Sequence, residues 1–206
     1  MKVLLINGSP HEKGCTYTAL SLIAGELKAQ GIETEILHVG GQPVGGCIGC
    51  GGCIGGNGCV FGGVVNEAIE KAKTADAFVF GSPVHYASAA GNMASFMDRL
   101  AYAGGKYLAY KPAAVCCSAR RAGTTSTLDQ LVKYPQFFHM PLVNGSYWAM
   151  VHGSNPEQVL QDAEGCAVMQ ELGRNMAWLL RCIEAGKAAG IDHPQNPPRP
   201  MTNFIR

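Results

Sequence analysis

The alternation of short apolar runs with longer amphipathic stretches is the feature that most narrows the possible folds of this sequence. Short apolar runs are typical of buried strands, whereas apolar residues spaced three or four apart are typical of helices. The predicted strands cover residues 2–7, 33–39, 77–80, 113–117 and 141–147. The predicted helices cover residues 16–29, 64–73, 90–103, 124–133 and 156–186. Strand and helix alternate throughout, which predicts an α/β fold: a doubly wound, five-stranded parallel sheet with helices on both faces.

The composition suits one packed domain and excludes several classes of protein. Hydrophobic residues make up 47% of the chain and charged residues 15%, a balance that excludes disordered and coiled-coil proteins. Lysine and arginine number 16 against 15 acidic residues, and the net charge of +1 argues against nucleic-acid binding. We expect one domain over residues 1–191, with a cysteine-rich insertion at 44–60, and a proline-rich arm at 192–206.

The apolar runs are too short for a membrane span or a secretion signal. A membrane-spanning helix needs about 18 apolar residues in a row, and no such run occurs. The first apolar run ends at Gly8, too early for the core of a signal peptide. We therefore expect a cytoplasmic protein with no membrane partner.

Clusters of glycine, serine and proline follow the first, third and fourth predicted strands. Ligands of doubly wound sheets lie at the carboxyl ends of the strands, so these loops are expected to line one crevice. The first loop, residues 8–18, offers hydroxyl groups and a helix N-terminus, which favour an anion. Cys15 lies at that N-terminus, where the pKa of a thiol is expected to be lowered. The loop has neither the phosphate-loop pattern of nucleoside triphosphatases nor the dinucleotide fingerprint G-x-G-x-x-G.

Four cysteines on a glycine-rich stretch form the most informative motif of the chain: Cys47-x2-Cys50-x2-Cys53-x5-Cys59. Closely spaced thiolates of this kind suit a [4Fe-4S] cluster. A structural zinc ion with four cysteine ligands is a second interpretation, although zinc sites usually have two separated pairs. A third interpretation is a loop of free thiols, or of thiols paired in disulfides.

Each of these features also has a purely structural interpretation. The first loop is also consistent with a capped helix after a tight turn, and residues 81–86 with the end of a strand. Asp98 and Arg99 are most simply a solvated or helix-capping pair, and Arg120 and Arg121 fit surface charges equally well. The remaining cysteines outside the motif suit the packed core: Cys116, Cys117, Cys166 and Cys182.

Four segments, in order along the chain, carry a resemblance to a known family. They are residues 8–16, 81–86, 92–99 and 118–125. Together they resemble the NADPH-dependent FMN reductase family, which has a flavodoxin-like fold. The cysteine motif after the second strand resembles that of the iron–sulfur flavoproteins, which are relatives of this family.

The resemblance implies that the chain binds FMN noncovalently, and it assigns residues to the site. The residues around the phosphate are Ser9, His11, Cys15, Thr16 and Tyr17. The residues beside the ring and the ribityl chain are Pro83, Val84, His85, Tyr86 and Ser118. Arg120 or Arg121, placed after the fourth strand, suits a flavin or nicotinamide-nucleotide phosphate. The family usually has arginine at the position of His11 and asparagine or serine at that of Cys15. The metal ligands are Cys47, Cys50, Cys53 and Cys59.

The resulting hypothesis is an FMN-dependent NAD(P)H oxidoreductase that passes electrons to a quinone, a metal or another acceptor, small molecule or redox protein. No acid–base pair or nucleophilic triad is evident, so no catalytic side chain is predicted. One alternative is a ferredoxin-linked iron–sulfur electron-transfer flavoprotein, and another is a flavin- or redox-sensing protein without turnover. The resemblance also implies a homodimer or a homotetramer.

Overall fold

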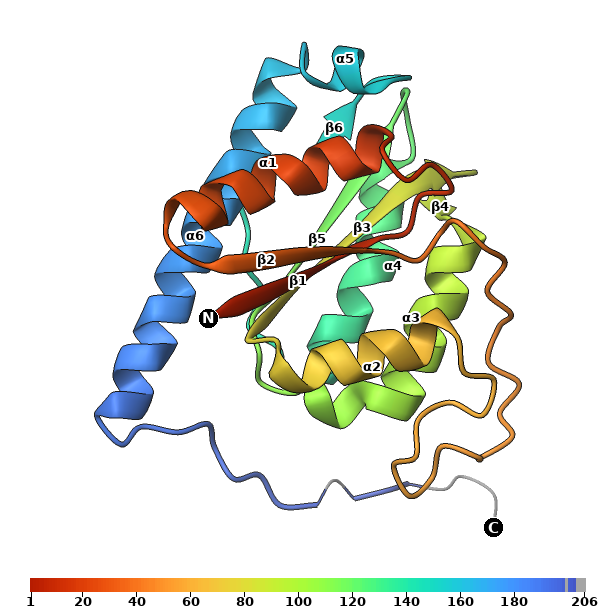
Figure 1. Cartoon of the computed structure of the whole chain (residues 1–206), viewed down its shortest axis with the longest axis vertical. Coiled ribbons are helices and arrows are strands. Elements are labelled where there is room, and N and C mark those ends of the chain that lie inside the picture. Colours follow the sequence, from red (N-terminus) through yellow and green to blue (C-terminus); the bar gives the residue numbers. More distant parts are fainter. Residues whose placement is uncertain (199, 203–206) are drawn as a thin grey trace.

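A computed structural model describes residues 1–198 and 200–202, and strands alternate with helices along the chain (Figure 1). The strands are β1 (Lys2–Asn7), β2 (Glu33–His38), β3 (Ala77–His85), β4 (Ser88–Ala89), β5 (Ala113–Ala119) and β6 (Met150–His152). The helices are α1 (Cys15–Ala29), α2 (Val64–Thr74), α3 (Gly91–Gly104), the 3-10 helix η1 (Gly105–Tyr107), α4 (Thr124–Phe137), α5 (Pro156–Val159) and α6 (Ala163–Ala188).

Five strands form a parallel sheet in the order β2-β1-β3-β5-β6, and the short β4 pairs antiparallel with the end of β3. The chain starts in the second strand from one edge, adds β2 at that edge, and then crosses over to add β3, β5 and β6 on the other side of β1. This strand order is that of the flavodoxin-like doubly wound fold. The prediction of a five-stranded parallel sheet is therefore confirmed.

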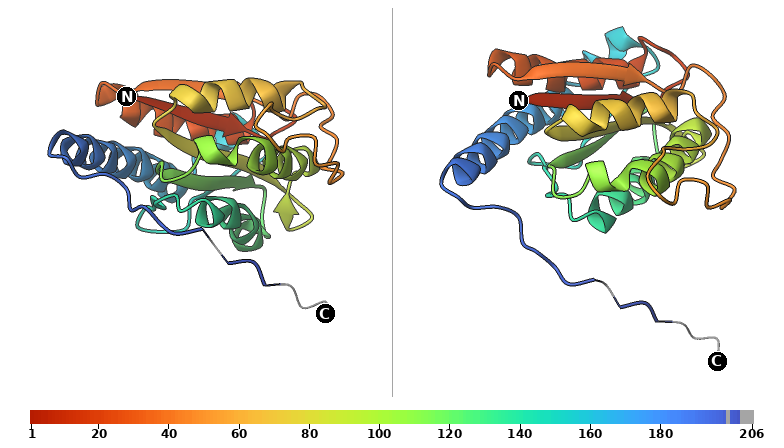
Figure 2. Two further views of the ribbon diagram at one scale, coloured as in Figure 1. Left: turned by 90° about the horizontal axis from the view of Figure 1, so that it is seen from below. Right: turned by 60° about the horizontal axis from the view of Figure 1, so that its bottom comes forward.

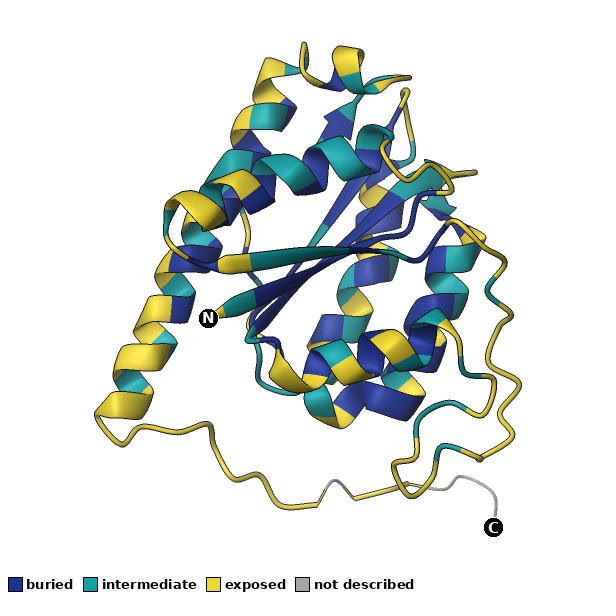
Figure 3. Cartoon of the chain, in the orientation of Figure 1, coloured by how far each residue is buried: buried dark blue, intermediate teal, exposed yellow. Residues whose placement is uncertain are grey.

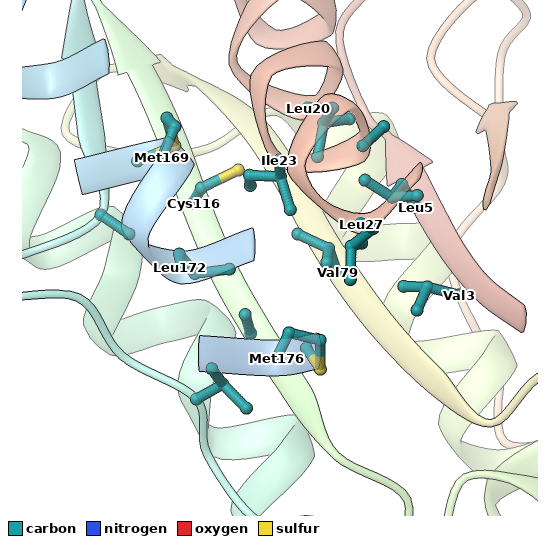
Figure 4. Close-up of a cluster of buried hydrophobic side chains, with 14 of the residues drawn as sticks. Val3, Leu5, Leu20, Ile23, Leu27, Val79, Cys116, Met169, Leu172 and Met176 are labelled. Atoms are coloured by element: carbon teal, nitrogen blue, oxygen red, sulfur yellow. The ribbon is translucent and has the colours of Figure 1, made fainter. Parts of the chain in front are cut away.

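The strands are apolar on both faces because helices cover both sides of the sheet. Successive strand residues point to opposite faces, so Val3 and Leu5 enter one core while Leu4 and Ile6 enter the other. The first core lies under α1 and α6, where Ile23 and Leu172 also pack (Figure 4). The second core lies under α2, α3 and α4.

Three predicted elements were wrong in their bounds. The third strand runs over Ala77–His85 and not over residues 77–80. The fifth strand is Met150–His152 and not residues 141–147; in the predicted range, Leu142 makes only an isolated bridge to Ala113. The helix predicted at 156–186 is two helices, because the Asp162 side chain accepts a hydrogen bond from the Gly165 N–H and starts a new helix at Ala163.

The C-terminal arm leaves the end of α6 and has no regular secondary structure at 192–198 and 200–202 (Figure 2). His193 stacks on the ring of Tyr110 with 4.4 Å between centroids, and the Asn196 amide donates to the Tyr110 hydroxyl at 2.6 Å. Residues 199 and 203–206 of the predicted arm lie outside the described residues. Within the described part of the chain, no helix combines the length and apolarity needed to cross a membrane.

Candidate functional site

Three loops meet at the carboxyl edge of the sheet, because β1, β3 and β5 are neighbours in it (Figure 1). The Gly8 N–H donates to the Gly81 carbonyl at 2.9 Å and joins the first loop to β3. The hydroxyl groups of Thr16 and Ser118 lie 2.8 Å apart and join the start of α1 to the end of β5. The structure thus brings together loops from three parts of the chain, as the sequence predicts.

The first loop is shaped by a buried asparagine, Asn7, that is not among the residues predicted from the sequence. Asn7 is fully buried; its Oδ1 accepts from the Ser9 N–H at 3.1 Å, and its Nδ2 donates to the Glu12 carbonyl at 2.9 Å. The Ser9 hydroxyl in turn accepts from the His11 N–H at 3.1 Å. A polar residue that ends an otherwise apolar strand, directly before glycine, is the signal that could have identified Asn7.

The end of β2 also contacts the first loop. His38 Nε2 lies 2.8 Å from the Ser9 carbonyl oxygen, and this histidine was likewise missed. Gly40 lies so close to the Ser9 backbone that any Cβ at this position would collide with it. A hollow of about 390 Å³ borders this contact, and Pro10, Glu12 and His38 are among its lining residues.

The N-terminus of α1 fits an anion such as the FMN phosphate. The helix begins at Cys15, and no side chain caps it. The backbone N–H groups of a first helical turn have no partner within the helix, and the helix dipole adds partial positive charge there. Ser9 and Thr16 are buried and bonded to other protein atoms, while Tyr17 is half-buried and His11 is exposed. This helix N-terminus therefore favours a bound anion, and it lies beside the buried hydroxyl groups of Ser9 and Thr16.

The pKa of the Cys15 thiol is shifted in the direction opposite to the expected one. The pKa of its thiol is raised, because partial burial outweighs the backbone hydrogen bond that would lower it. Its sulfur also donates to the Gly153 carbonyl at 3.5 Å. The expectation of a lowered thiol pKa at this helix N-terminus was therefore wrong.

The second loop is a hairpin and not a simple turn after a strand. The strand β3 continues through Pro83 and Val84 to His85, which pairs with Ser88. The hairpin tip is Tyr86 and Ala87, both with positive φ (50° and 59°), and the Tyr86 side chain is fully exposed. Such backbone strain in residues other than glycine is concentrated at ligand sites.

The helix α4 holds this hairpin in place. The Gln130 Oε1 accepts from the Ser88 hydroxyl at 2.7 Å and from the Ala89 N–H at 2.9 Å. Gly123, which precedes α4, has φ +97°, and a Cβ there would lie 2.7 Å from Ala87 Cα. The third loop therefore packs directly against the second.

The third loop leaves its two arginines at the surface. Arg120 and Arg121 are exposed, whereas Ser118 before them is buried. The Arg121 carbonyl lies 3.2 Å from His152 Nε2, so β6 supports the backbone of this loop. The role of these arginines toward a phosphate stays a prediction.

The cysteine motif lies on a long exposed segment between β2 and α2 (Figure 3). Cys47 and Cys50 are exposed, while Cys53 and Cys59 are half-buried and pack against the second core. All four are free thiols, so the donor set has the chemistry that an iron–sulfur cluster or a zinc ion needs. However, in the described part of the chain no three potential ligands are gathered closely enough to hold a metal ion. The donor chemistry fits such a centre, and the present arrangement of the thiols does not.

Arg99, expected in a solvated pair, is instead buried beneath this segment. Its side chain comes from α3, and its Nε donates to the Cys59 sulfur at 3.2 Å. Phe96 and Ala103 lie on the same face of α3 at helical spacing, which is the signal that could have identified the burial of Arg99. Its neighbour Asp98 accepts from the Tyr134 hydroxyl at 2.6 Å.

The cysteines outside the motif have different environments. Cys116 and Cys117 are buried as predicted, and burial raises the pKa of the Cys117 thiol to about 12. Cys166 is half-buried and donates to the Val159 carbonyl at 3.2 Å. Cys182 is exposed on α6, so the expectation that it packs in the core was wrong.

Known proteins resemble this chain along most of its length. The family model described as NADPH-dependent FMN reductase matches residues 1–155. An iron-sulfur flavoprotein of Methanocaldococcus jannaschii is 28% identical over 192 residues, covering 89% of this chain and 100% of the relative. The solved structure of RosB, with a bound 8-demethyl-8-formylriboflavin-5'-phosphate intermediate, has a TM-score of 0.70 at 14% identity and covers 100% of this chain and 96% of its own. A flavodoxin from the domain Archaea has a TM-score of 0.60 at 14% identity, covering 88% of this chain and 99% of its own.

Proposed function

Since the chain belongs to the NADPH-dependent FMN reductase family and is an FMN-dependent oxidoreductase, we propose that NAD(P)H reduces its flavin and that the electrons then pass to a quinone, a metal or another acceptor. The observation that carries this proposal is the junction of three loops at the carboxyl edge of the sheet, beside the uncapped N-terminus of α1. When bound, FMN supplies the ring that accepts hydride, and the protein supplies binding and orientation.

The residues of the site have separate tasks in this proposal. The backbone N–H groups at the start of α1 hold the phosphate, and Asn7 and His38 keep the first loop in shape. Thr16 and Ser118 fix the distance between the first and third loops. Val84 and Tyr86 on the hairpin border the ring, and Gln130 keeps the hairpin from moving. Hydride transfer from the nicotinamide would need no side chain that donates or accepts a proton.

Steady-state oxidation of NADH and of NADPH by the FMN-loaded protein tests the proposal. We expect turnover with at least one of the two and with a quinone or a ferric complex as acceptor. Reduction by ferredoxin, with no oxidation of either nicotinamide, would instead favour the iron–sulfur electron-transfer flavoprotein. A protein that binds FMN and turns over with none of these donors would be a binding protein.

We further propose that Cys47, Cys50, Cys53 and Cys59 hold a [4Fe-4S] cluster. Their spacing supports this, as does the similarity to a protein named an iron-sulfur flavoprotein. Formation of the cluster requires the four thiols to come closer together than they lie in the described part of the chain. The other arrangements predicted from the sequence, a zinc ion or free thiols, are the alternative outcomes of the test.

Single serine substitutions test the cluster. After anaerobic purification, each of the four variants should lose iron and sulfide while it retains FMN, because the flavin loops come from other parts of the chain. Cys182→Ser serves as the matched control, since its thiol is exposed on α6. Wild-type protein with neither iron nor sulfide would contradict the proposed cluster. Stoichiometric zinc in that protein would support a zinc site in place of the cluster.

We also propose a homodimer or a homotetramer. Tyr147 and Trp148 are exposed beside a hollow of about 400 Å³ between α4 and residues 144–149, and their rings lie edge to face with 4.6 Å between centroids. Exposed aromatic residues that cluster in this way are typical of subunit contacts. Light scattering on the FMN-loaded protein measures the mass directly, and a monomer would contradict the proposal.

A further inference from the structure

The end of β6 contacts two of the three loops of the predicted flavin site. His152 is the last residue of β6, and its Nε2 lies 3.2 Å from the Arg121 carbonyl oxygen in the third loop. The next residue, Gly153, donates its N–H to the Ala119 carbonyl at 3.0 Å and accepts from the Cys15 thiol at 3.5 Å. This end of β6 therefore joins the third loop to the start of α1.

One carboxylate holds the backbone of His152 and faces its ring. The Asp162 Oδ2 accepts from the His152 N–H at 2.7 Å and lies 3.6 Å from the ring Nδ1. The Oδ1 of the same side chain accepts from the Gly165 N–H at 3.0 Å, at the start of α6. A Cβ at Gly165 would collide with this carboxylate. Asp162 is thus fixed against α6, and it fixes the place of His152.

The two ring nitrogens of His152 face different acceptors. A backbone carbonyl oxygen only accepts hydrogen bonds, so the contact with Arg121 requires the proton on Nε2. The other nitrogen, Nδ1, faces the Asp162 carboxylate. The partners of its two nitrogens orient a histidine ring, and rotation of this ring would break these contacts. The ring is therefore held with its Nε2–H toward the third loop.

The third loop, residues 120–123, presents two cations to the solvent. Arg120 and Arg121 are exposed, and over residues 1–198 and 200–202 no carboxylate forms an ion pair with either of them. Guanidinium groups bind phosphate oxygens through paired, charge-assisted hydrogen bonds. His152 contacts the loop backbone at Arg121 itself, so it sets where these two side chains begin.

We propose that His152, oriented by Asp162, is a positioning residue that holds the third loop so that Arg120 and Arg121 meet the phosphate groups of the nicotinamide nucleotide. The inference rests on the proposed function and adds two residues that act on the loop. A loop that is already ordered binds its ligand more tightly, because less conformational freedom is lost on binding. The contact therefore affects the KM for the nucleotide and leaves kcat unchanged.

Three substitutions of His152 and one control test this role. His152→Leu removes both ring nitrogens, His152→Gln keeps an N–H donor at a similar reach, and His152→Asn keeps a polar side chain that is too short to reach the Arg121 carbonyl. The control is His193→Leu in the C-terminal arm, whose ring stacks on Tyr110. All variants are loaded with FMN. If His152→Leu does not retain FMN, His152→Asn takes its place in each comparison.

Trypsin reports the position of the loop without any turnover, because it cleaves after exposed arginines such as Arg120 and Arg121. Cleavage of a folded protein follows the population of the locally opened form. We expect cleavage of His152→Leu at these two sites to be about 2–10-fold faster than in the wild type, the effect of one lost hydrogen bond. His152→Gln and His193→Leu should be cleaved at the wild-type rate. Fragment masses identify the sites, and an unchanged rate in His152→Leu would overturn the inference.

Steady-state kinetics test the link between the loop and the nucleotide. With the nicotinamide nucleotide that the wild type oxidises, His152→Leu should raise KM about 2–10-fold at unchanged kcat. His152→Gln should restore the wild-type KM, which a loss of packing alone would not predict. A wild-type KM in a variant that trypsin cleaves faster would also overturn the inference.

Failure of the proposed function is distinguishable from failure of this inference. Wild-type protein that oxidises neither NADH nor NADPH would contradict the proposed function. Cleavage by trypsin is then repeated with NAD⁺ and with NADP⁺, and a bound nucleotide should slow cleavage at Arg120 and Arg121. His152→Leu should need about 2–10-fold more of that nucleotide for the same protection. Absence of protection by either nucleotide in the wild type, or equal protection in His152→Leu, would overturn the inference.

Discussion

At the scale of single residues, the contact between Thr16 and Ser118 is the most direct test of the flavin site. The two hydroxyl groups are 2.8 Å apart, both residues are buried, and they join the first and third loops. We expect Thr16→Ala to weaken FMN binding by about 1–3 kcal/mol, because a buried hydroxyl loses its partner and the phosphate loop loses its support. Fluorescence titration with FMN measures the change.

The same pair allows a double-mutant cycle. Ser118→Ala should have a similar effect, and the double variant should lose less than the sum, because both substitutions remove one hydrogen bond. Thr74→Ala is the control, since its hydroxyl donates to the Lys71 carbonyl at 3.3 Å at the end of α2. Unchanged FMN affinity in both single variants would show that the phosphate does not lie in this loop.

At the scale of elements, the start of α4 determines where the hairpin lies. Gly123 has φ +97°, and a Cβ there would lie 2.7 Å from Ala87 Cα and 2.9 Å from Val84 Cγ1. We expect Gly123→Ala to lower the free energy of unfolding by about 1–3 kcal/mol, because both the backbone and the packing are strained. It should also weaken FMN binding, since Val84 belongs to the predicted site. Urea denaturation and FMN titration measure the two effects.

A second glycine provides the opposite expectation. Gly25 lies inside α1, and a Cβ there would meet nothing within 4 Å. Gly25→Ala should therefore raise the free energy of unfolding by about 0.5–1 kcal/mol, since alanine favours the helix. Equal effects of the two substitutions would contradict the strain assigned to Gly123.

At the scale of the whole molecule, a network of charged side chains joins the start of β1 to β2 and α2. The flavin loops lie at the other end of the strands. The Glu35 carboxylate lies 2.8 Å from Lys2 Nζ and 2.6 Å from Lys71 Nζ. Hydrogen bonds from Lys2 and then from Lys71 lower the pKa of Glu35. A lowered carboxyl pKa stabilises the fold above the pKa of the unfolded chain, about 4.3, and this stabilisation is lost as the pH falls.

Glu35→Gln should therefore be less stable than the wild type at neutral pH, and the difference should shrink as the pH is lowered below about 4. The effect is modest because the Glu35 side chain is 30% exposed. Urea denaturation at several pH values measures it. Glu184→Gln removes the same charge without an ion pair among the described residues and is the control. A difference for Glu35→Gln that persists unchanged in acid would refute this assignment.

The sequence by itself determined the class and order of this fold and the loops that form the candidate site. Strand and helix periods, and glycine, serine or proline after a strand, depend on residues within a few positions of one another. That is why the bounds of β1, α1, β2 and α2 were predicted closely. The three loops were located as well, although the second is a hairpin formed by β3 and β4. The short β6 was misplaced because only pairing with Cys117–Ala119 distinguishes Met150–His152 from the apolar residues before it.

Only the tertiary structure decided which side chains the site uses and how they are arranged. Thr16 and Ser118 are 102 positions apart, and Cys15 and Gly153 are 138 positions apart, so neither contact leaves a local pattern. From the sequence alone, Arg99 is expected at the surface because it is charged. It is buried because the segment that contains Cys59, 40 positions earlier in the chain, covers it. Burial and long-range partners determine charge balance, thiol pKa and ligand geometry, and they are set by packing between distant parts of the chain.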